Sequence, residues 1–122
     1  MSQYFNYGTD KMLACSCCGV KGMKPSFLMR LDQIRKDVDE PLIITSGYRC
    51  SKHNRKVSST GDNGPHTTGE AVDIKADSRL RFKIIQSAIK HGFTRIGVAK
   101  TFIHIDSLGE LEGFPAQRVW SY

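Results

Sequence analysis

The chain has 122 residues, of which 39% are hydrophobic and 25% are charged, so we expect a single domain over residues 1–122 with one core, and the composition excludes a disordered protein. Its 18 basic and 12 acidic residues give a net charge of +6, which predicts an anionic partner such as nucleic acid, acidic lipid or a cell wall. No run approaches the roughly 18 apolar residues of a membrane-spanning helix, and the polar segment 1–12 lacks the apolar core of a signal peptide, so we expect neither membrane insertion nor a cleaved leader.

A cysteine-rich segment, residues 15–18 with the sequence CSCC, lies near the start of the chain, and the fourth cysteine is Cys50. Cys15 and Cys18 have CxxC spacing, while Cys50 and His53 have CxxH spacing, so a structural zinc site can be drawn from these four side chains. The alternative is a set of reduced, partly buried thiols. Disulfides are not required, because a chain of this length can build its own core.

An amphipathic helix is predicted to begin at Pro25 and to end before Pro41, because apolar residues recur there at helical spacing. The short β-branched run at residues 42–45 predicts a buried strand. The stretch 48–65 is polar, and within it residues 58–65, SSTGDNGP, predict a loop. The apolar residues of the helix are Phe27, Leu31, Ile34 and Val38.

The second half of the chain continues with strand and helix patterns. Residues 71–74 predict a second strand, and Asp77 can cap a following helix that ends near Gly92. Residues 95–99 and 102–106 predict two further strands, separated by a tight hairpin. A small antiparallel sheet with helices packed against it is an α+β domain, which is the fold class we expect.

Two polar residues, Asp73 and His104, interrupt these strands at positions where core residues are expected. Unpaired burial of a carboxylate or an imidazole costs several kcal/mol, and one metal ion satisfies both groups. His66, on the turn before the second strand, can supply a third ligand, which leaves one tetrahedral position open as in catalytic zinc sites. Each residue taken alone is as readily explained as a hydrogen-bonded core residue or an ion-pair partner. Only their combination indicates a metal site.

Three segments together resemble the M15 zinc D,D-peptidases, also called the LAS or hedgehog-like metallopeptidases. Residues 64–73, GPHTTGEAVD, resemble the family signature SxHxxGxAxD. Residues 46–49, SGYR, resemble its SGYR segment. Residues 102–106, FIHID, resemble the FxHxD strand of the branch that includes phage endolysins and murein endopeptidases. The three segments occur in the order of the family.

The resemblance implies a hedgehog-like fold in which His66, Asp73 and His104 bind one catalytic zinc ion. Arg49 matches the family arginine that engages the substrate and stabilises the developing oxyanion, a role that suits a permanently charged, planar guanidinium. The implied activity is zinc-dependent hydrolysis of an amide bond in the peptide stem or crosslink of peptidoglycan, by an enzyme of the D-Ala-D-Ala carboxypeptidase or peptidoglycan endopeptidase type.

The sequence departs from the family pattern at the general base. Several branches carry an acid or a histidine two or three residues before the last zinc ligand, where this chain has Phe102 and Thr101. Asp106 is the best local substitute for the catalytic base, and the alternative role for it is an acceptor that orients the imidazole of His104. Two further candidates for the base are Glu70 and His53.

We expect a monomer that acts on peptidoglycan peptide stems, binds no nucleic acid and reaches the cell wall by phage-type release, because no export signal is visible. One alternative is a binding module of the same fold that keeps its zinc but has lost hydrolysis, which the missing acid before His104 favours. Another is a zinc-containing nucleic-acid binder that uses the cysteines and the +6 charge, although no aromatic residues interleave with the basic ones.

Overall fold

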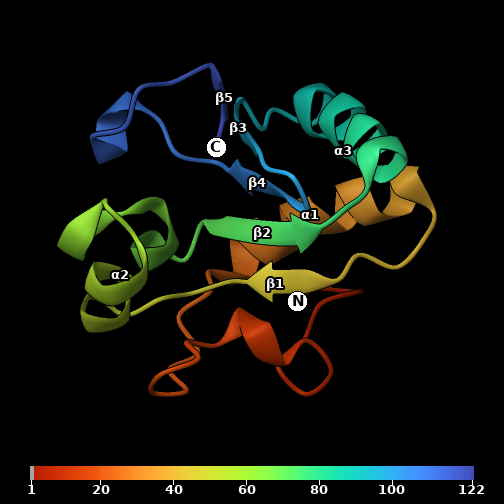
Figure 1. Ribbon diagram of the computed structural model, residues 1–122. Coiled ribbons are helices and arrows are strands. Elements are labelled where there is room, and N and C mark those ends of the chain that lie inside the picture. Colours follow the sequence, from red (N-terminus) through yellow and green to blue (C-terminus); the bar gives the residue numbers. More distant parts are fainter. Residues whose placement is uncertain (1) are drawn as a thin grey trace.

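The computed structural model describes residues 2–122, which form a five-stranded sheet with two long helices on one face (Figure 1). Short 3-10 helices lie in the connections between the main elements. The helices are α1 (Pro25–Val38), α2 (Ser51–Val57) and α3 (Ser78–Lys90). The strands are β1 (Ile44–Ser46), β2 (Ala71–Lys75), β3 (Arg95–Val98), β4 (Phe102–Asp106) and β5 (Arg118–Ser121). The 3-10 helices are η1 (Lys11–Leu13), η2 (Gly61–Asn63), η3 (Pro65–Thr68) and η4 (Glu110–Glu112).

The strands lie in the order β1-β2-β4-β3-β5, so β4 inserts between β2 and its hairpin partner β3. All neighbouring pairs are antiparallel except β3 and β5, which run parallel. The sheet is therefore mixed but mostly antiparallel, and the predicted α+β class is confirmed. The edge strand β5 was not predicted, because its four residues, RVWS, follow a glycine- and proline-containing loop and show no long apolar pattern.

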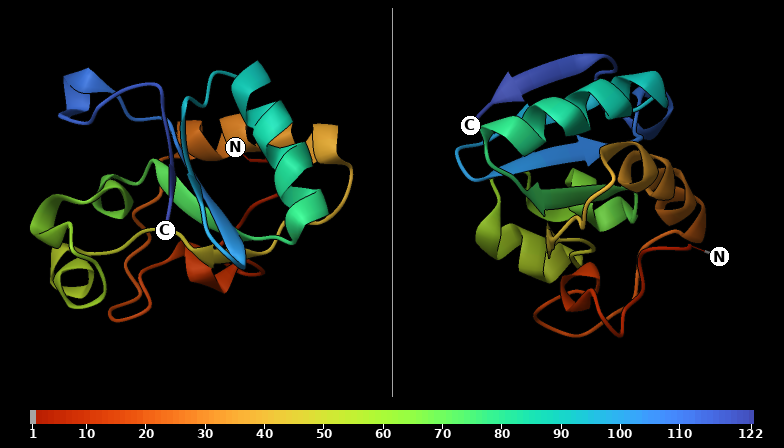
Figure 2. Two further views of the ribbon diagram at one scale, coloured as in Figure 1. Left: turned by 45° about the horizontal axis from the view of Figure 1, so that its top comes forward. Right: turned by 90° about the vertical axis from the view of Figure 1, so that its right-hand side faces the viewer.

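Helices α1 and α3 pack side by side against the sheet (Figure 2). Proline at the first position of α1 suits the helix start, since its missing N–H would have no partner there. The carboxylate of Asp77 accepts the N–H of Leu80 and so caps α3. Where the two helices meet the core, the rings of Phe27 and Phe93 contact edge to face at 5.7 Å.

The two faces of the sheet differ in chemistry because side chains alternate along each strand. Val72 and Ile74 of β2 and Ile103 and Ile105 of β4 are buried in the apolar core under the helices. The residues between them point to the opposite face and are polar. The fold thus places the strand residues Asp73, His104 and Asp106 together, on the side of the sheet away from α1 and α3.

The polar stretch 48–65 contains a helix, α2, that was not predicted. The loop predicted at residues 58–65 contains the short 3-10 helix η2. The sequence of α2, SKHNRKV, has a single apolar residue at its end and shows no helical apolar periodicity. The helix is instead capped at its N-terminus by Cys50, whose sulfur accepts the N–H of His53 at 3.4 Å. The first strand also begins two residues later than predicted, at Ile44. Within residues 2–122, no helix has both the length and the apolar composition needed to cross a membrane.

Candidate metal centre

A single row of paired residues runs across the sheet through all five strands. Asp73 of β2 lies directly opposite His104 of β4, and His104 lies opposite Gly97 of β3. A side chain at position 97 would collide with the indole of Trp120, because a Cβ there would lie 2.6 Å from its Nε1. Glycine therefore lets Trp120 lie over the sheet beside His104, with ring centroids 5.4 Å apart. The row, in sheet order, is Ser46, Asp73, His104, Gly97 and Trp120.

His66 reaches this row from η3, just before β2. The chain leaves η3 through Gly69, which has a positive φ of 79°. A side chain there would also strike the carbonyl oxygen of Gly22, so both conformation and space require glycine. The resulting turn brings the His66 ring to 5.1 Å from the His104 ring, measured between centroids.

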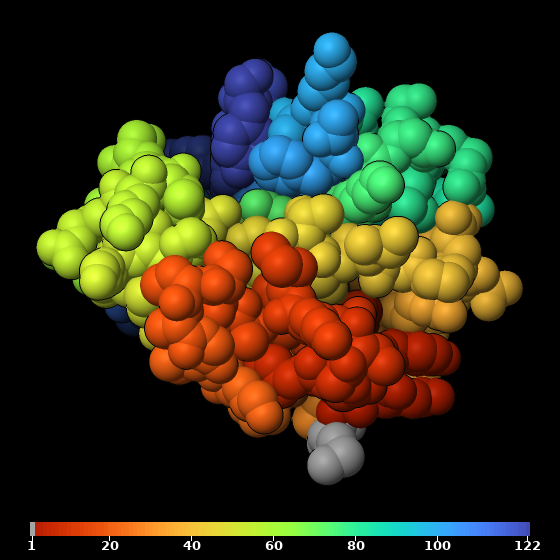
Figure 3. Space-filling view, turned by 60° about the horizontal axis from the view of Figure 1, so that its bottom comes forward, coloured from red at the N-terminus to blue at the C-terminus, as the bar shows by residue number. Residues whose placement is uncertain are grey.

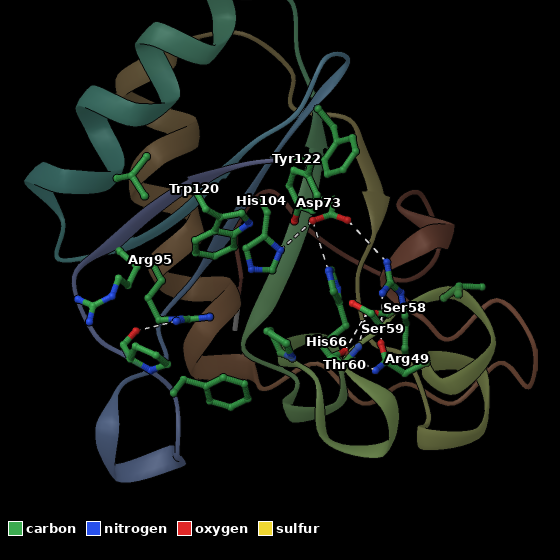
Figure 4. A pocket seen from close by; sticks show the side chains of 18 residues that line it. Arg49, Ser58, Ser59, Thr60, His66, Asp73, Arg95, His104, Trp120 and Tyr122 are labelled. Carbon is green, nitrogen blue, oxygen red and sulfur yellow. Dashed lines mark hydrogen bonds and ion pairs between the residues drawn. The ribbon is translucent and has the colours of Figure 1, made fainter.

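The three predicted zinc ligands converge in the structure (Figure 4). Oδ1 of Asp73 lies 2.9 Å from Nδ1 of His104 and 3.3 Å from Nε2 of His66. One ligand atom from each of the three residues lies within 4.8 Å of the others. All three side chains are buried. The geometry is therefore that of a three-donor cluster gathered around one point.

The chemistry of the donors fits a metal ion. Nδ1 of His66 lies 2.7 Å from the carbonyl oxygen of Gly47, which can only accept, so this nitrogen carries a proton. Nε2 of His104 likewise faces a carboxylate oxygen of Asp106 at 2.7 Å. In the neutral imidazoles the two remaining lone pairs then point at Asp73, and three acceptors meet without a donor. Histidine ligands of metals are held in this way, by a carbonyl or carboxylate on the second ring nitrogen.

The pKa shifts of two residues in the cluster also indicate that a positive charge is stabilised there. Burial alone would raise the pKa of Asp73, but His104 and His66, when protonated on the nitrogens that face it, donate hydrogen bonds that outweigh burial and hold that pKa well below its usual range. Burial alone would lower the pKa of His104, but its hydrogen bonds to Asp106 and Asp73 raise that pKa instead. A cation, either a proton or a metal ion, is thus stabilised at this point.

Asp106 contacts the cluster through the outer ring nitrogen of His104. The residue is completely buried, and its Oδ2 binds His104 while its Oδ1 accepts from Nε of Arg95 at 2.8 Å and from the N–H of Leu108 at 3.1 Å. Both oxygens therefore have partners within the protein. This environment is that of an acceptor that fixes an imidazole.

Arg95 is a site residue that the sequence analysis missed. It is buried at the start of β3, where it holds Asp106 and donates to the carbonyl of Pro115 at 2.6 Å. Its guanidinium also lies over the rings of Phe114 and Trp120, at 5.2 and 5.1 Å. An available signal was its position, because Arg95 pairs with Asp106 across the predicted hairpin.

Arg49 lies at the edge of the cluster. Its Nη2 is 3.7 Å from Oδ2 of Asp73. Its Nε donates to Oγ of Ser46 and its Nη1 donates to Oδ1 of Asn54, each at 3.2 Å. The side chain is 18% exposed, so the guanidinium is fixed in orientation and still faces solvent.

A cavity of about 620 Å³ opens over the cluster and reaches from α2 to β5. Three arginines and several aromatic side chains surround it, and Figure 4 shows Arg49, Arg95, Trp120 and Tyr122 around Asp73 and His104. Of all carboxylates in residues 2–122, Asp73 alone lines the cavity. Among the side chains that line it are Arg49, Arg95, Phe114, Trp120 and Tyr122.

Two further candidates for the base have other partners. Glu70 binds Nζ of Lys24 at 3.0 Å and Oγ of Ser107 at 3.2 Å. Nε2 of His53 lies 3.0 Å from Oγ of Ser16. The predicted pairing of His53 with the cysteines is not found in the structure, because the His53 ring faces Ser16 instead. The sulfur cluster in the described chain instead consists of Cys15, Cys17, Cys18 and Cys50.

Comparison with known proteins agrees with this geometry. The profile of the protein family described as Peptidase M15 matches residues 4–106. The match includes Arg49 and the whole His66, Asp73 and His104 cluster, while β5 lies beyond it. No curated protein matches the chain.

Proposed function

The chain belongs to the peptidase M15 family, and we propose that it is a zinc-dependent metallopeptidase that hydrolyses an amide bond in the peptide stem or crosslink of peptidoglycan. One observation carries the proposal. The donors of His66, Asp73 and His104 converge, buried, beneath an open cavity, with the outer ring nitrogens already engaged. Three protein ligands and one open position are the arrangement of catalytic zinc.

The three residues would hold zinc through Nε2 of His66, Nδ1 of His104 and a carboxylate oxygen of Asp73. Zinc bound there would supply a water of lowered pKa and would polarise the scissile carbonyl. The cluster is rigid because two of its members are paired residues of adjacent strands. That rigidity keeps the donor geometry fixed before the substrate binds.

Arg49 would bind the carbonyl oxygen of the scissile amide and stabilise the negative charge that develops on it. Ser46 and Asn54 hold its guanidinium beside Asp73, so the positive charge requires no rearrangement during the reaction. The planar group offers two parallel donors, which an ammonium group cannot.

Asp106 orients His104 in our proposal rather than acting as the base. A general base must reach the water that it deprotonates, whereas Asp106 is 0% exposed and its two oxygens accept hydrogen bonds from His104, Arg95 and the Leu108 N–H. Arg95 in turn holds Asp106 in place through a buried ion pair.

The cavity suits a peptide that carries carboxylates. Arg49 and Arg118 lie at its walls, and Trp120 and Tyr122 offer aromatic surface for the peptide backbone. The stems of peptidoglycan carry free carboxylates, which these arginines would bind. Whether the enzyme is a carboxypeptidase or an endopeptidase depends on how far the stem extends beyond the scissile bond.

We further propose that it acts on the wall after phage-type release.

A zinc-containing module that binds wall peptides without cutting them is the second candidate function. The observation that favours it is the absence of a second carboxylate from the cavity wall within residues 2–122. Binding and hydrolysis differ only in turnover, so a digestion assay separates them.

The test is digestion of purified peptidoglycan with mass analysis of the released fragments. The zinc-loaded protein should release peptide fragments whose masses identify the bond. The His66→Ala variant should reduce release to background, because a zinc ligand is lost. His91→Ala is the matched control, since His91 pairs with Asp37 on the helical side of the fold and should keep full activity.

The hydrolase proposal fails if the zinc-loaded protein releases no fragment from walls of several chemotypes. Retained binding of the zinc-loaded protein to those walls, abolished by His66→Ala, would then establish the binding module.

A further inference from the structure

The four cysteines form a second cluster, remote in sequence from the first. Three of them lie in the turn 15–18, and the fourth, Cys50, is the N-cap residue of α2. The sulfur of Cys17 lies 3.7 Å from that of Cys15 and 3.5 Å from that of Cys50. All four sulfurs, including that of Cys18, lie within 4.8 Å of one another. Figure 3 shows the segment around residues 15–22 against α2 on the surface of the molecule.

The turn that gathers three sulfurs is tightly built. The N–H of Gly19 donates to the carbonyl of Cys15 at 2.7 Å, and the N–H of Cys15 donates to the carbonyl of Val20 at 2.9 Å. Gly19 has a positive φ of 74°, which favours glycine at this position. The backbone therefore folds back on itself and directs the thiols of 15–18 toward one point.

The sulfur separations match a tetrahedral metal site. Four sulfurs at about 2.3 Å from a zinc ion lie about 3.8 Å from one another. The two printed separations, 3.5 and 3.7 Å, are close to that value. They are much longer than the sulfur–sulfur bond of a disulfide, which is about 2.05 Å.

Backbone N–H groups point at two of the sulfurs. The N–H of Cys50 donates to the sulfur of Cys15 at 3.3 Å, and the N–H of His53 donates to the sulfur of Cys50 at 3.4 Å. Such bonds stabilise thiolates, which are the ligands that bind metal. The first of these bonds crosses from the start of α2 to the turn and so joins the two segments that supply the sulfurs.

We propose that Cys15, Cys17, Cys18 and Cys50 bind a structural zinc ion in a closed tetrathiolate site. Four thiolates leave no open position, so the site is structural rather than catalytic. Binding releases the thiol protons to solvent, and no oxidation or reduction takes place. The proposal does not depend on the hydrolase function, because the two clusters share no residue.

The zinc would fix the loop that carries Arg49. The residue after Arg49 is a ligand, and the N–H of Tyr48 already bonds the carbonyl of Leu13 at 2.9 Å. Helix α2 also supplies Asn54, which orients Arg49. The N-terminal segment before α1 has little regular structure beyond the 3-10 helix η1, and a metal cross-link would tie it to the start of α2.

The test measures zinc content in the full chain with the first cluster disabled. A His66→Ala/His104→Ala variant purified under reducing conditions should retain about one zinc per chain, and the unmodified chain about two. Adding Cys17→Ser should lower the remaining zinc to about zero. Ser16→Ala is the matched control, because it changes the same turn without removing a sulfur, and it should keep the zinc.

A second measurement uses the unmodified chain and so does not depend on how variants fold. The cysteine thiols should react slowly with a thiol reagent until a strong chelator is added. A third measurement returns to the His66→Ala/His104→Ala variant, in which replacement of zinc by cobalt should give the visible absorption of a tetrahedral thiolate complex. Rapid reaction of all thiols without a chelator, a disulfide in the freshly purified chain, or no zinc in that variant would overturn the proposal.

Discussion

The two clusters of metal-ligating side chains differ in almost every physical respect. His66, Asp73 and His104 are buried on a sheet, offer nitrogen and oxygen donors, and open into a cavity. The cysteines lie on a turn and a helix start, and two of them, Cys17 and Cys18, are exposed. Borderline nitrogen and oxygen donors with an open position suit chemistry on a substrate, whereas a closed set of soft sulfur donors suits a cross-link.

The difference teaches how each site obtains its rigidity. The first cluster is aligned by strand register, and its outer nitrogens are held by Gly47 and Asp106 without any metal. The second depends on a turn that contacts the start of a short helix, and one long N–H···S bond, from Cys50 to Cys15, joins the two. We therefore expect loss of metal to stop activity at the first cluster and to lower stability at the second.

The largest expected effect comes from stepwise removal of metal. A competing chelator should remove zinc first from the open cluster, so that peptidoglycan digestion falls to background while the thiols stay protected and the Tm changes little. A stronger chelator should then expose the thiols and lower the Tm. Activity, thiol reactivity and Tm measured on the same samples check this order. Simultaneous loss of all three would show that the clusters are not independent.

Loss of Arg49 should separate catalysis from metal binding. Arg49→Ala should lower activity by about 100- to 1,000-fold, because a fixed donor for the developing oxyanion is removed. Arg49→Lys should be only partly active, since the second parallel donor is lost. Kinetics and zinc content are the measurements, with exposed Lys52→Ala on α2 as the control. Loss of zinc from Arg49→Ala would instead give the arginine a structural role.

Asp106→Asn should act through the metal. If Asp106 orients His104, zinc affinity and activity at limiting zinc should fall by roughly 10- to 100-fold. Chelator competition measures the affinity, and exposed Asp62→Asn is the matched control. A large loss of kcat at saturating zinc with unchanged zinc affinity would contradict the orienting role and indicate a catalytic base.

The smallest effect, on the pH dependence of the Tm, is expected at the ion pair between Asp37 and His91, which belongs to neither cluster. Hydrogen bonds from Ser87 and His91 hold the pKa of Asp37 below its ordinary value of 3.8. The unfolded chain thus binds this proton more readily than the folded one. The stabilisation is complete above the ordinary pKa and is lost as pH falls through the lowered pKa.

Asp37→Asn should therefore lower the Tm slightly at neutral pH and flatten the acid side of the Tm profile below about pH 4. Thermal unfolding across pH measures this, and zinc content should not change. An unaltered acid limb in this variant would assign the acid sensitivity to other carboxylates, such as those of the metal centre.

Local pattern alone predicted much of this molecule. Helical periodicity predicted α1, and β-branched runs with hairpin spacing predicted β2, β3 and β4. These elements are predictable because the pattern of apolar and polar residues that favours them is local in the sequence. The same alternation put Asp73 and His104 on one face of the sheet. Together with the M15-like segments, it predicted as zinc ligands the three side chains that the structure brings together.

Tertiary structure decided the rest. Sequence spacing favoured His53 as the fourth partner of the cysteines, but only the folded turn shows that Cys17 is nearer Cys50. The sequence left Asp106 open between two roles, and its burial against Arg95 favours one of them. These outcomes depend on contacts between distant segments, because a side chain's neighbours and exposure are set by packing and not by its place in the chain.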